Sequence, residues 1–144
     1  MNNTNLNTLL HLNKAHTALT KRFDRGMGNG IGFNEFLILF YIHQADNTQL
    51  RRIDLAEKIG ITASGITRLL LPMEKIGLIQ TVANQGDDAR VRMVKITKGG
   101  KEKMNEAQEQ LDLFLAEVFK CIDDKNKELL SDMLIQIGGK ALML

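Results

Sequence analysis

Several residue types are scarce in this chain of 144 residues, and each scarcity excludes a class of protein. A single cysteine, Cys121, rules out a framework of internal disulfide bonds and fits a reducing compartment, so we expect a cytoplasmic protein. One proline and no tryptophan, beside many leucines and isoleucines, favour helices. No apolar run approaches the length of a membrane span, and the polar N-terminus lacks the plan of a signal peptide. We therefore expect neither a membrane protein nor a disulfide-rich secreted domain.

The groups that would make an enzyme or a metal site are equally scarce. None of the histidines (His11, His16 and His43) forms a compact pair with cysteine or carboxylate at metal-ligand spacing. The glycine-rich stretch 25–32 has neither the spacing nor the lysine of a phosphate-binding loop. No nucleophile–base pair or carboxylate pair stands out either. We predict no catalytic residue, no metal and no cofactor, and hence that the protein is not an enzyme.

The net charge of +2 hides an uneven distribution. Residues 51–103 hold 11 lysines and arginines against 6 acidic residues, whereas the rest of the chain holds 8 against 11. A basic centre between acidic ends suits a protein that meets a polyanion only with its middle. Chance clustering is the plain alternative, so the charge supports a nucleic-acid partner without identifying one.

The stretch 62–76, TASGITRLLLPMEKI, has the pattern of an amphipathic helix at the centre of this basic region. Thr62 or Ser64 can cap its N-terminus through a hydroxyl, and Gly77 stands where a left-handed residue ends a helix. The predicted apolar stripe, at helical spacing, consists of Ile66, Leu69, Met73 and Ile76.

The predicted outward face at the start of this helix carries short hydroxyls and one arginine: Thr62, Ser64, Thr67 and Arg68. No acidic residue occurs there before Glu74. Such a face suits contacts with phosphates and base edges of DNA. By itself the face is equally compatible with an ordinary solvated helix, so the flanking elements must decide.

The flanking elements complete a winged helix-turn-helix pattern. A short helix is predicted over 52–59, ended by Gly60, with an inner face of Ile53, Leu55, Ala56 and Ile59. Leu50 is predicted to start a very short strand before it. After Gly77, a strand over 78–82, a polar turn over 83–89 and an alternating strand over 90–96 predict a β-hairpin wing.

Four further helices are predicted around this centre, over residues 4–24, 34–44, 97–122 and 125–138. Their expected N-terminal caps are Thr4 or Asn5, Asn34, Thr97, and Asp123 or Asp124. Gly138-Gly139 is expected to end the last helix. The first and last helices show more apolar surface than one small winged domain can cover, and Cys121 is expected to be buried or at an interface.

The order of elements, and the residues from 50 to 100, resemble the MarR family of winged-helix transcription regulators. The helix-turn-helix DLAEKIGITASGITRLLLPMEKIGLI matches that family, as does the wing pattern Asp88-Ala89-Arg90 followed by Val94-Lys95-Ile96-Thr97 and Gly100. Departures are Pro72, Gln80 and Gly65, where many members carry arginine, arginine and a small hydroxyl residue. The implied fold class is mainly α (α+β), a winged helix-turn-helix over 34–100 with a helical dimerisation region formed by 1–33 and 101–144.

The resemblance also implies roles for particular side chains. Ser64, Thr67 and Arg68 match recognition-helix positions, and Arg68 is the expected reader of a guanine edge. Arg90 matches the wing arginine that enters the minor groove, Asp88 is expected to orient it, and Arg92 is a third wing residue. Further expected phosphate contacts, for which a solvated basic edge is an equal interpretation, are Arg51, Arg52, Lys58 and Lys95.

The expected function is therefore that of a homodimeric, sequence-specific regulator that binds a palindromic operator in double-stranded DNA. It is expected to be a repressor released by a small apolar or phenolic effector, for which a pocket lined by the first, second and fifth helices is one possibility and plain core the other. Two alternatives stay open: a winged-helix interaction module that no longer reads DNA, and a redox-responsive regulator that uses Cys121.

Overall fold

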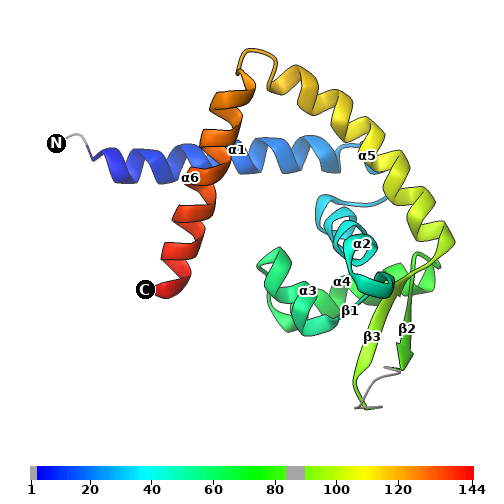
Figure 1. Cartoon of the computed structure of the whole chain (residues 1–144). Helices are drawn as coiled ribbons and strands as arrows, with labels where there is room; N and C mark the ends of the chain where they lie inside the picture. The colour runs from blue at the N-terminus through cyan, green and yellow to red at the C-terminus, as the bar shows by residue number, and fades with distance from the viewer. Residues whose placement is uncertain (1–2, 84–89) are drawn as a thin grey trace. The chain divides into compact units, whose positions relative to one another are not determined.

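The structure is a computed structural model that describes residues 3–83 and 90–144. The chain divides into two compact units, Met1–Leu111 and Asp112–Leu144. Along the chain the elements are α1 (Thr4–Asp24), α2 (Phe33–Gln44), the 3-10 turn η1 (Asp46–Thr48), β1 (Gln49–Arg51), α3 (Arg52–Ile59), α4 (Ala63–Lys75), β2 (Ile79–Ala83), β3 (Arg92–Ile96), α5 (Lys98–Val118) and α6 (Asp124–Met143) (Figure 1). Helix α5 begins in the first unit and ends in the second.

The sheet of the first unit has three antiparallel strands in the order β1-β3-β2. Val94 in the central strand pairs with Leu50 of β1 and with Thr81 of β2. Val94 and Ile96 are buried, so the period-two alternation of the sequence places one face of β3 on the core. The short strand predicted near Leu50 is confirmed, whereas β3 begins at Arg92, two residues later than predicted.

Helices α3 and α4 form the predicted helix-turn-helix. Gly60 ends α3 with φ of +80°, and Gly77 follows α4 with the same φ, a conformation that a side chain disfavours. At the end of α4 the Gly77 N–H donates to the Glu74 carbonyl at 3.0 Å and the Leu78 N–H to the Met73 carbonyl at 3.0 Å. These two bonds make a Schellman motif, and they satisfy carbonyls that a helix end leaves unpaired.

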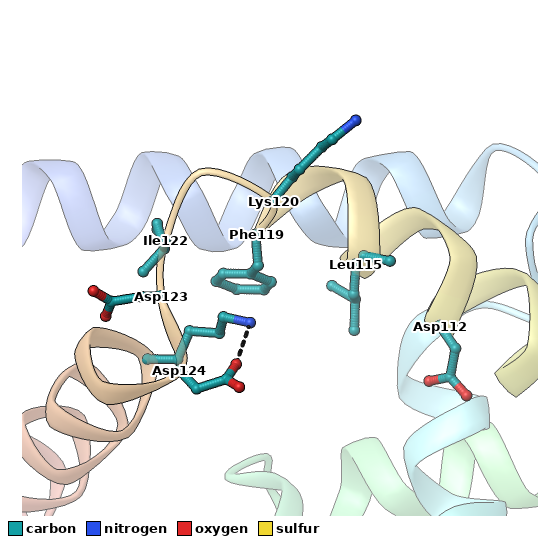
Figure 2. A pocket seen from close by; sticks show the side chains of 9 residues that line it. Asp112, Leu115, Phe119, Lys120, Ile122, Asp123 and Asp124 are labelled. Carbon is teal, nitrogen blue, oxygen red and sulfur yellow. Dashed lines mark hydrogen bonds and ion pairs between the residues drawn. The ribbon is translucent and has the colours of Figure 1, made fainter.

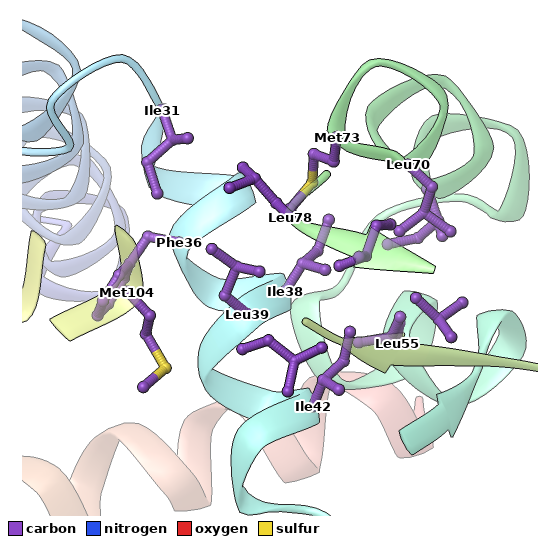
Figure 3. Packing of buried hydrophobic residues seen from close by; sticks show 14 of the residues in the cluster. Ile31, Phe36, Ile38, Leu39, Ile42, Leu55, Leu70, Met73, Leu78 and Met104 are labelled. Carbon is purple, nitrogen blue, oxygen red and sulfur yellow. The ribbon is translucent and has the colours of Figure 1, made fainter. Parts of the chain in front are cut away.

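The core of the first unit is built around α2, whose side chains Phe36, Ile38, Leu39 and Ile42 are all buried. Figure 3 shows these residues meeting Leu55 of α3, Leu70 and Met73 of α4, and Leu78. Leu70, which the predicted stripe omitted, is buried, whereas Ile76 and Ile53 are 66% and 63% exposed and were wrongly placed inside. The stripe of α4 thus runs through Ile66, Leu70 and Met73.

Several predicted helix ends need correction. Asn3 caps α1, since its side chain accepts from the Leu6 N–H. Helix α2 starts at Phe33 after Gly32 rather than at a cap formed by Asn34, because acidic side chains take its first amides: Asp24 accepts from the Phe33 N–H at 2.8 Å and Glu35 from the Gly32 N–H at 3.3 Å.

At the C-terminal side, α5 ends at Val118, four residues earlier than predicted. Asp123 caps α6 as expected, by accepting from the Asn126 N–H at 2.8 Å. Helix α6 runs through Gly138 and Gly139 to Met143, because neither glycine adopts a positive φ. Within the described ranges, no helix is long and apolar enough to cross a membrane.

Candidate nucleic-acid interface

The N-terminus of α4 is held by a hydroxyl cap. Thr62 has an extended backbone (φ −71°, ψ 158°), and its Oγ1 accepts a hydrogen bond from the Gly65 N–H at 3.0 Å. The Ser64 hydroxyl lies 3.1 Å from the same oxygen. A Cβ at Gly65 would lie 3.1 Å from Thr62 Oγ1, so the glycine leaves space for the cap. The first turn of α4 therefore presents two exposed hydroxyls at a helix end that favours anions.

Thr67 and Arg68 follow on α4, in different environments. Arg68 is exposed as predicted, and among residues 3–83 and 90–144 it has no ion-pair partner. Thr67 is half-buried, because its Oγ1 accepts a hydrogen bond from Arg52 Nη1 at 3.4 Å. The prediction that Thr67 points outward is thus only partly right: its hydroxyl turns toward the start of α3.

Arg51, at the end of β1, makes a bidentate ion pair with Asp54 in the first turn of α3. Its Nε donates to Oδ2 at 2.9 Å and its Nη2 to Oδ1 at 3.1 Å. This side-chain hydrogen bond lowers the pKa of the Asp54 carboxyl, and the same pair raises the pKa of the Arg51 guanidinium. Arg51 would therefore meet a DNA phosphate only in competition with Asp54.

Lys58, near the end of α3, is exposed, and its Nζ lies over the ring of Tyr41 at 5.7 Å from the ring centroid. That distance is within the range of a cation–π contact. Both residues border a surface hollow whose apolar part is formed by Leu50 and Met93. The Lys58 ammonium group therefore already has a contact within the protein, to the ring of Tyr41 in α2.

The wing strands place their cations differently. Arg92 begins β3 opposite Ala83 and is exposed, whereas Lys95 is half-buried in the central strand, with Gln49 and Gln80 as its partners in the two ladders. Arg90 is exposed in the turn before β3. Asp88 lies outside the described residues, so its predicted role beside Arg90 stays a prediction.

Two contacts tie α4 to the wing and to α5. Glu74 of α4 accepts a hydrogen bond from the Thr81 N–H of β2 at 3.1 Å, a link that the sequence analysis missed. Thr97 caps α5 as predicted by accepting from the Gly100 N–H at 3.0 Å, and its hydroxyl donates to the Gly77 carbonyl just beyond α4. Helix α4, the wing and α5 are therefore joined by side-chain hydrogen bonds as well as by the core.

The second unit contains a surface hollow and the single cysteine of the chain. Figure 2 shows a hollow at the α5–α6 turn, where Leu115, Phe119 and Ile122 lie beside an ion pair between Asp124 and Lys127 at 2.9 Å. Cys121 in this turn is exposed and so is not buried within the single chain, while its alternative location at an interface between copies stays a prediction. Over the described parts of both units, no group of three or more His, Cys, Asp or Glu side chains could hold a metal ion.

Comparison with known proteins relates the centre of the chain to one family. A model of the MarR family matches residues 33–90, which run from α2 through the helix-turn-helix to the wing. This central part of the chain therefore matches the MarR family. The resemblance inferred from the motifs between residues 50 and 100 is thereby confirmed.

Relatives of known name agree with this placement. The chain is 24% identical over 108 residues to YdgJ of Bacillus subtilis (strain 168), an uncharacterized HTH-type transcriptional regulator, and the match spans 75% of this chain and 64% of YdgJ. Among solved structures, AbsC, a MarR family transcriptional regulator from Streptomyces coelicolor, has a TM-score of 0.87 at 17% identity, with 100% of this chain and 98% of AbsC covered.

Sco3205, a MarR family regulator from the same organism solved in complex with DNA, has a TM-score of 0.85 at 19% identity, with 99% of this chain and 93% of that protein covered. The transcriptional regulator BldR from Sulfolobus solfataricus has a TM-score of 0.81 at 23% identity, with coverages of 93% and 94%. These structures confirm the predicted mainly helical, winged fold. The MarR family and these relatives are transcriptional regulators, not enzymes.

Proposed function

We propose that this chain is a sequence-specific DNA-binding transcription regulator that inserts α4 into the major groove. The observation that carries the proposal is the first two turns of α4, where a capped helix end presents Ser64 and Arg68 to solvent and the helix has no acidic residue before Glu74. A hydroxyl and a guanidinium supply the donors that phosphates and base edges accept. The DNA complex of the structurally similar Sco3205 supports a DNA partner for this fold.

Within this proposal some side chains contact the base edges and others contact the grooves or the backbone of the DNA. Arg68 reads a guanine through its O6 and N7 acceptors, because a guanidinium can donate twice to that edge. Arg90 enters the neighbouring minor groove, where a narrow A·T-rich stretch concentrates negative potential. Arg92 lies exposed at the loop end of the wing strands and meets the DNA backbone.

We further propose that the active species is a homodimer formed through the first and last helices. The unit Asp112–Leu144 contains no buried residue, and a helical hairpin without a core is not stable by itself. Its uncovered apolar side chains include Leu129, Leu130, Met133, Leu134 and Ile137, which are 37–54% exposed. Leu6, Leu9 and Leu10 of α1 are 48–61% exposed as well. A second copy supplies the missing cover, and its twofold symmetry matches a palindromic operator.

Repression, and its release by a small apolar or phenolic effector, complete the proposal as predictions from the family resemblance. The hollow beside Tyr41 and Lys58 lies on the same unit as the recognition helix, so a ligand there would act on the DNA-binding part directly. The pocket predicted from the first, second and fifth helices stays a prediction.

The deciding experiment is selection of duplexes from a random-sequence library by the full-length protein, followed by gel-shift titrations at several salt concentrations. The proposal predicts a palindromic consensus, selective over competitor DNA, with affinity that falls steeply as salt rises. Arg68→Ala should relax the selected preference at one base pair of each half-site, while Lys140→Ala at the far end of α6 should leave the consensus unchanged. Failure to enrich any sequence would refute DNA reading and favour an interaction module.

A further inference from the structure

Leu71 occupies the centre of the outward face of α4, although neither the sequence analysis nor the family match gives it a role. At about 100° per residue, its direction falls between those of Thr67 and Arg68, within about 20° of Ser64. The side chain is 54% exposed. An apolar side chain therefore stands among the polar residues proposed to meet DNA.

The core does not account for this leucine. Ile66, Leu70 and Met73, each at most 2% exposed, project from the opposite side of α4 and fill the core there. Leu71 belongs neither to that buried cluster nor to the partly buried side chains packed against it. Its exposure leaves an apolar surface that folding of the first unit does not use.

The position of Leu71 suits a groove contact. It lies about 12 Å along the helix from Ala63, in the third turn after the capped end. Helical side chains lean toward the N-terminus, so Leu71 covers the surface beside Thr67 and Arg68. In the major groove the apolar group presented by a base pair is the 5-methyl group of thymine.

We propose that Leu71 packs against the 5-methyl group of a thymine in each operator half-site and so specifies that base. The inference rests on the proposed function, because it assigns a base to the same recognition helix. Arg68 supplies directed hydrogen bonds. Leu71 supplies an apolar contact that is made with thymine but not with cytosine, because cytosine lacks the methyl group.

The test replaces thymine by uracil in the selected operator, one position at a time, which removes one methyl group and leaves base pairing intact. Binding is measured by fluorescence anisotropy at fixed salt with the full-length protein. The wild type should lose affinity about fourfold at one thymine of each half-site, and about 15-fold when both half-sites are substituted. In Leu71→Ala, uracil and thymine at that position should bind alike.

Two control variants assign the effect to Leu71. Ile76→Ala removes a similarly exposed apolar side chain, 66% exposed, from the far end of the same helix segment, and it should keep the uracil penalty. Thr67→Ser removes the other methyl group near this face while keeping the hydroxyl that bonds Arg52, and it should also keep the penalty.

The outcomes separate this inference from the proposed function. If a consensus is selected and no thymine is sensitive to uracil, or if the penalty persists in Leu71→Ala, the leucine contact is refuted while DNA reading stands. If no consensus is selected at all, both proposals fail together.

Discussion

Substitution of Thr97 tests how much its two hydrogen bonds, which link the end of α4 to the start of α5, contribute to stability. Its hydroxyl accepts from the Gly100 N–H at 3.0 Å and donates to the Gly77 carbonyl, and so joins the start of α5 to the residue that stops α4. Thr97→Val keeps the shape of the side chain and removes only the hydroxyl. The variant therefore loses both bonds without opening a cavity.

The expected loss of stability follows from the environments of the two groups that bond the Thr97 hydroxyl, the Gly100 N–H and the Gly77 carbonyl. Gly100 is buried, so its N–H loses a cap that is worth about 1 kcal/mol. Gly77 is exposed, so water replaces its partner and the loss there is at the low end of about 0.5–1.5 kcal/mol. We expect Thr97→Val to lower the free energy of unfolding by about 1.5 kcal/mol. Thr97→Ser keeps the hydroxyl and should stay within about 0.5 kcal/mol of the wild type.

Urea unfolding monitored by circular dichroism measures this difference. With a slope of about 2 kcal/mol/M, a loss of about 1.5 kcal/mol moves the midpoint by about 0.75 M. Protein concentration must be the same for all variants, because a dimer gains apparent stability with concentration. A Thr97→Val midpoint within about 0.25 M of the wild type, at an unchanged slope, would refute the role assigned to the hydroxyl.

Three further predictions concern the DNA-binding surface. Arg68→Ala should cost about 1–3 kcal/mol on the selected operator and relax preference at one base pair; an equal loss on all sequences in anisotropy titrations would assign Arg68 to phosphate instead. Arg90→Ala should weaken binding most on operators with A·T-rich flanks, and equal losses on G·C-rich flanks would refute the minor-groove role. Asp54→Asn should release Arg51 toward phosphate and steepen the slope of log K against log salt by about 2 per dimer. Because Arg51 lowers the folded-state pKa of Asp54, the pair stabilises the wild type above pH about 4, and this contribution is lost as the pH falls through the folded-state pKa. The stability difference between wild type and Asp54→Asn should therefore disappear in acid; a difference that persists at pH 2 would contradict the assignment.

Features determined by local chemistry were predicted correctly. The cap at Thr62, the cap at Thr97 and the left-handed stops at Gly60 and Gly77 each depend on one side chain or one φ angle and its nearest amides. Sequence patterns contain that information directly. Gly138 shows the limit of this reasoning, because a glycine stops a helix only when the chain turns there, and α6 has nothing that makes it turn.

Features that depend on distant partners were not predictable from the pattern. Periodicity placed Ile76 in the stripe of α4, but the buried stripe ends at Met73, and Ile76 is the cap residue after the helix and is exposed. The start of α2 is decided by Asp24, nine residues before Phe33. Thr67 was expected to face outward, and only the packing of α3 against α4 brings Arg52 within reach of its hydroxyl.

Not every basic residue in 51–103 is available to bind DNA, because several already make contacts within the protein. Arg51 is held by Asp54, Lys58 lies over Tyr41, and Arg52 bonds Thr67, so binding of a phosphate by any of them must first displace a contact within the protein. Arg68, by contrast, is exposed without an ion-pair partner among the described residues. Arg51, Arg52 and Lys58 lie in or next to α3, where they make contacts within the protein. The exposed face of α4 that is proposed to meet DNA keeps its hydrogen-bond donors available. We therefore expect DNA-binding specificity to depend on the basic side chains that make no contact within the protein, so that a count of basic residues alone would assign too many of them to DNA.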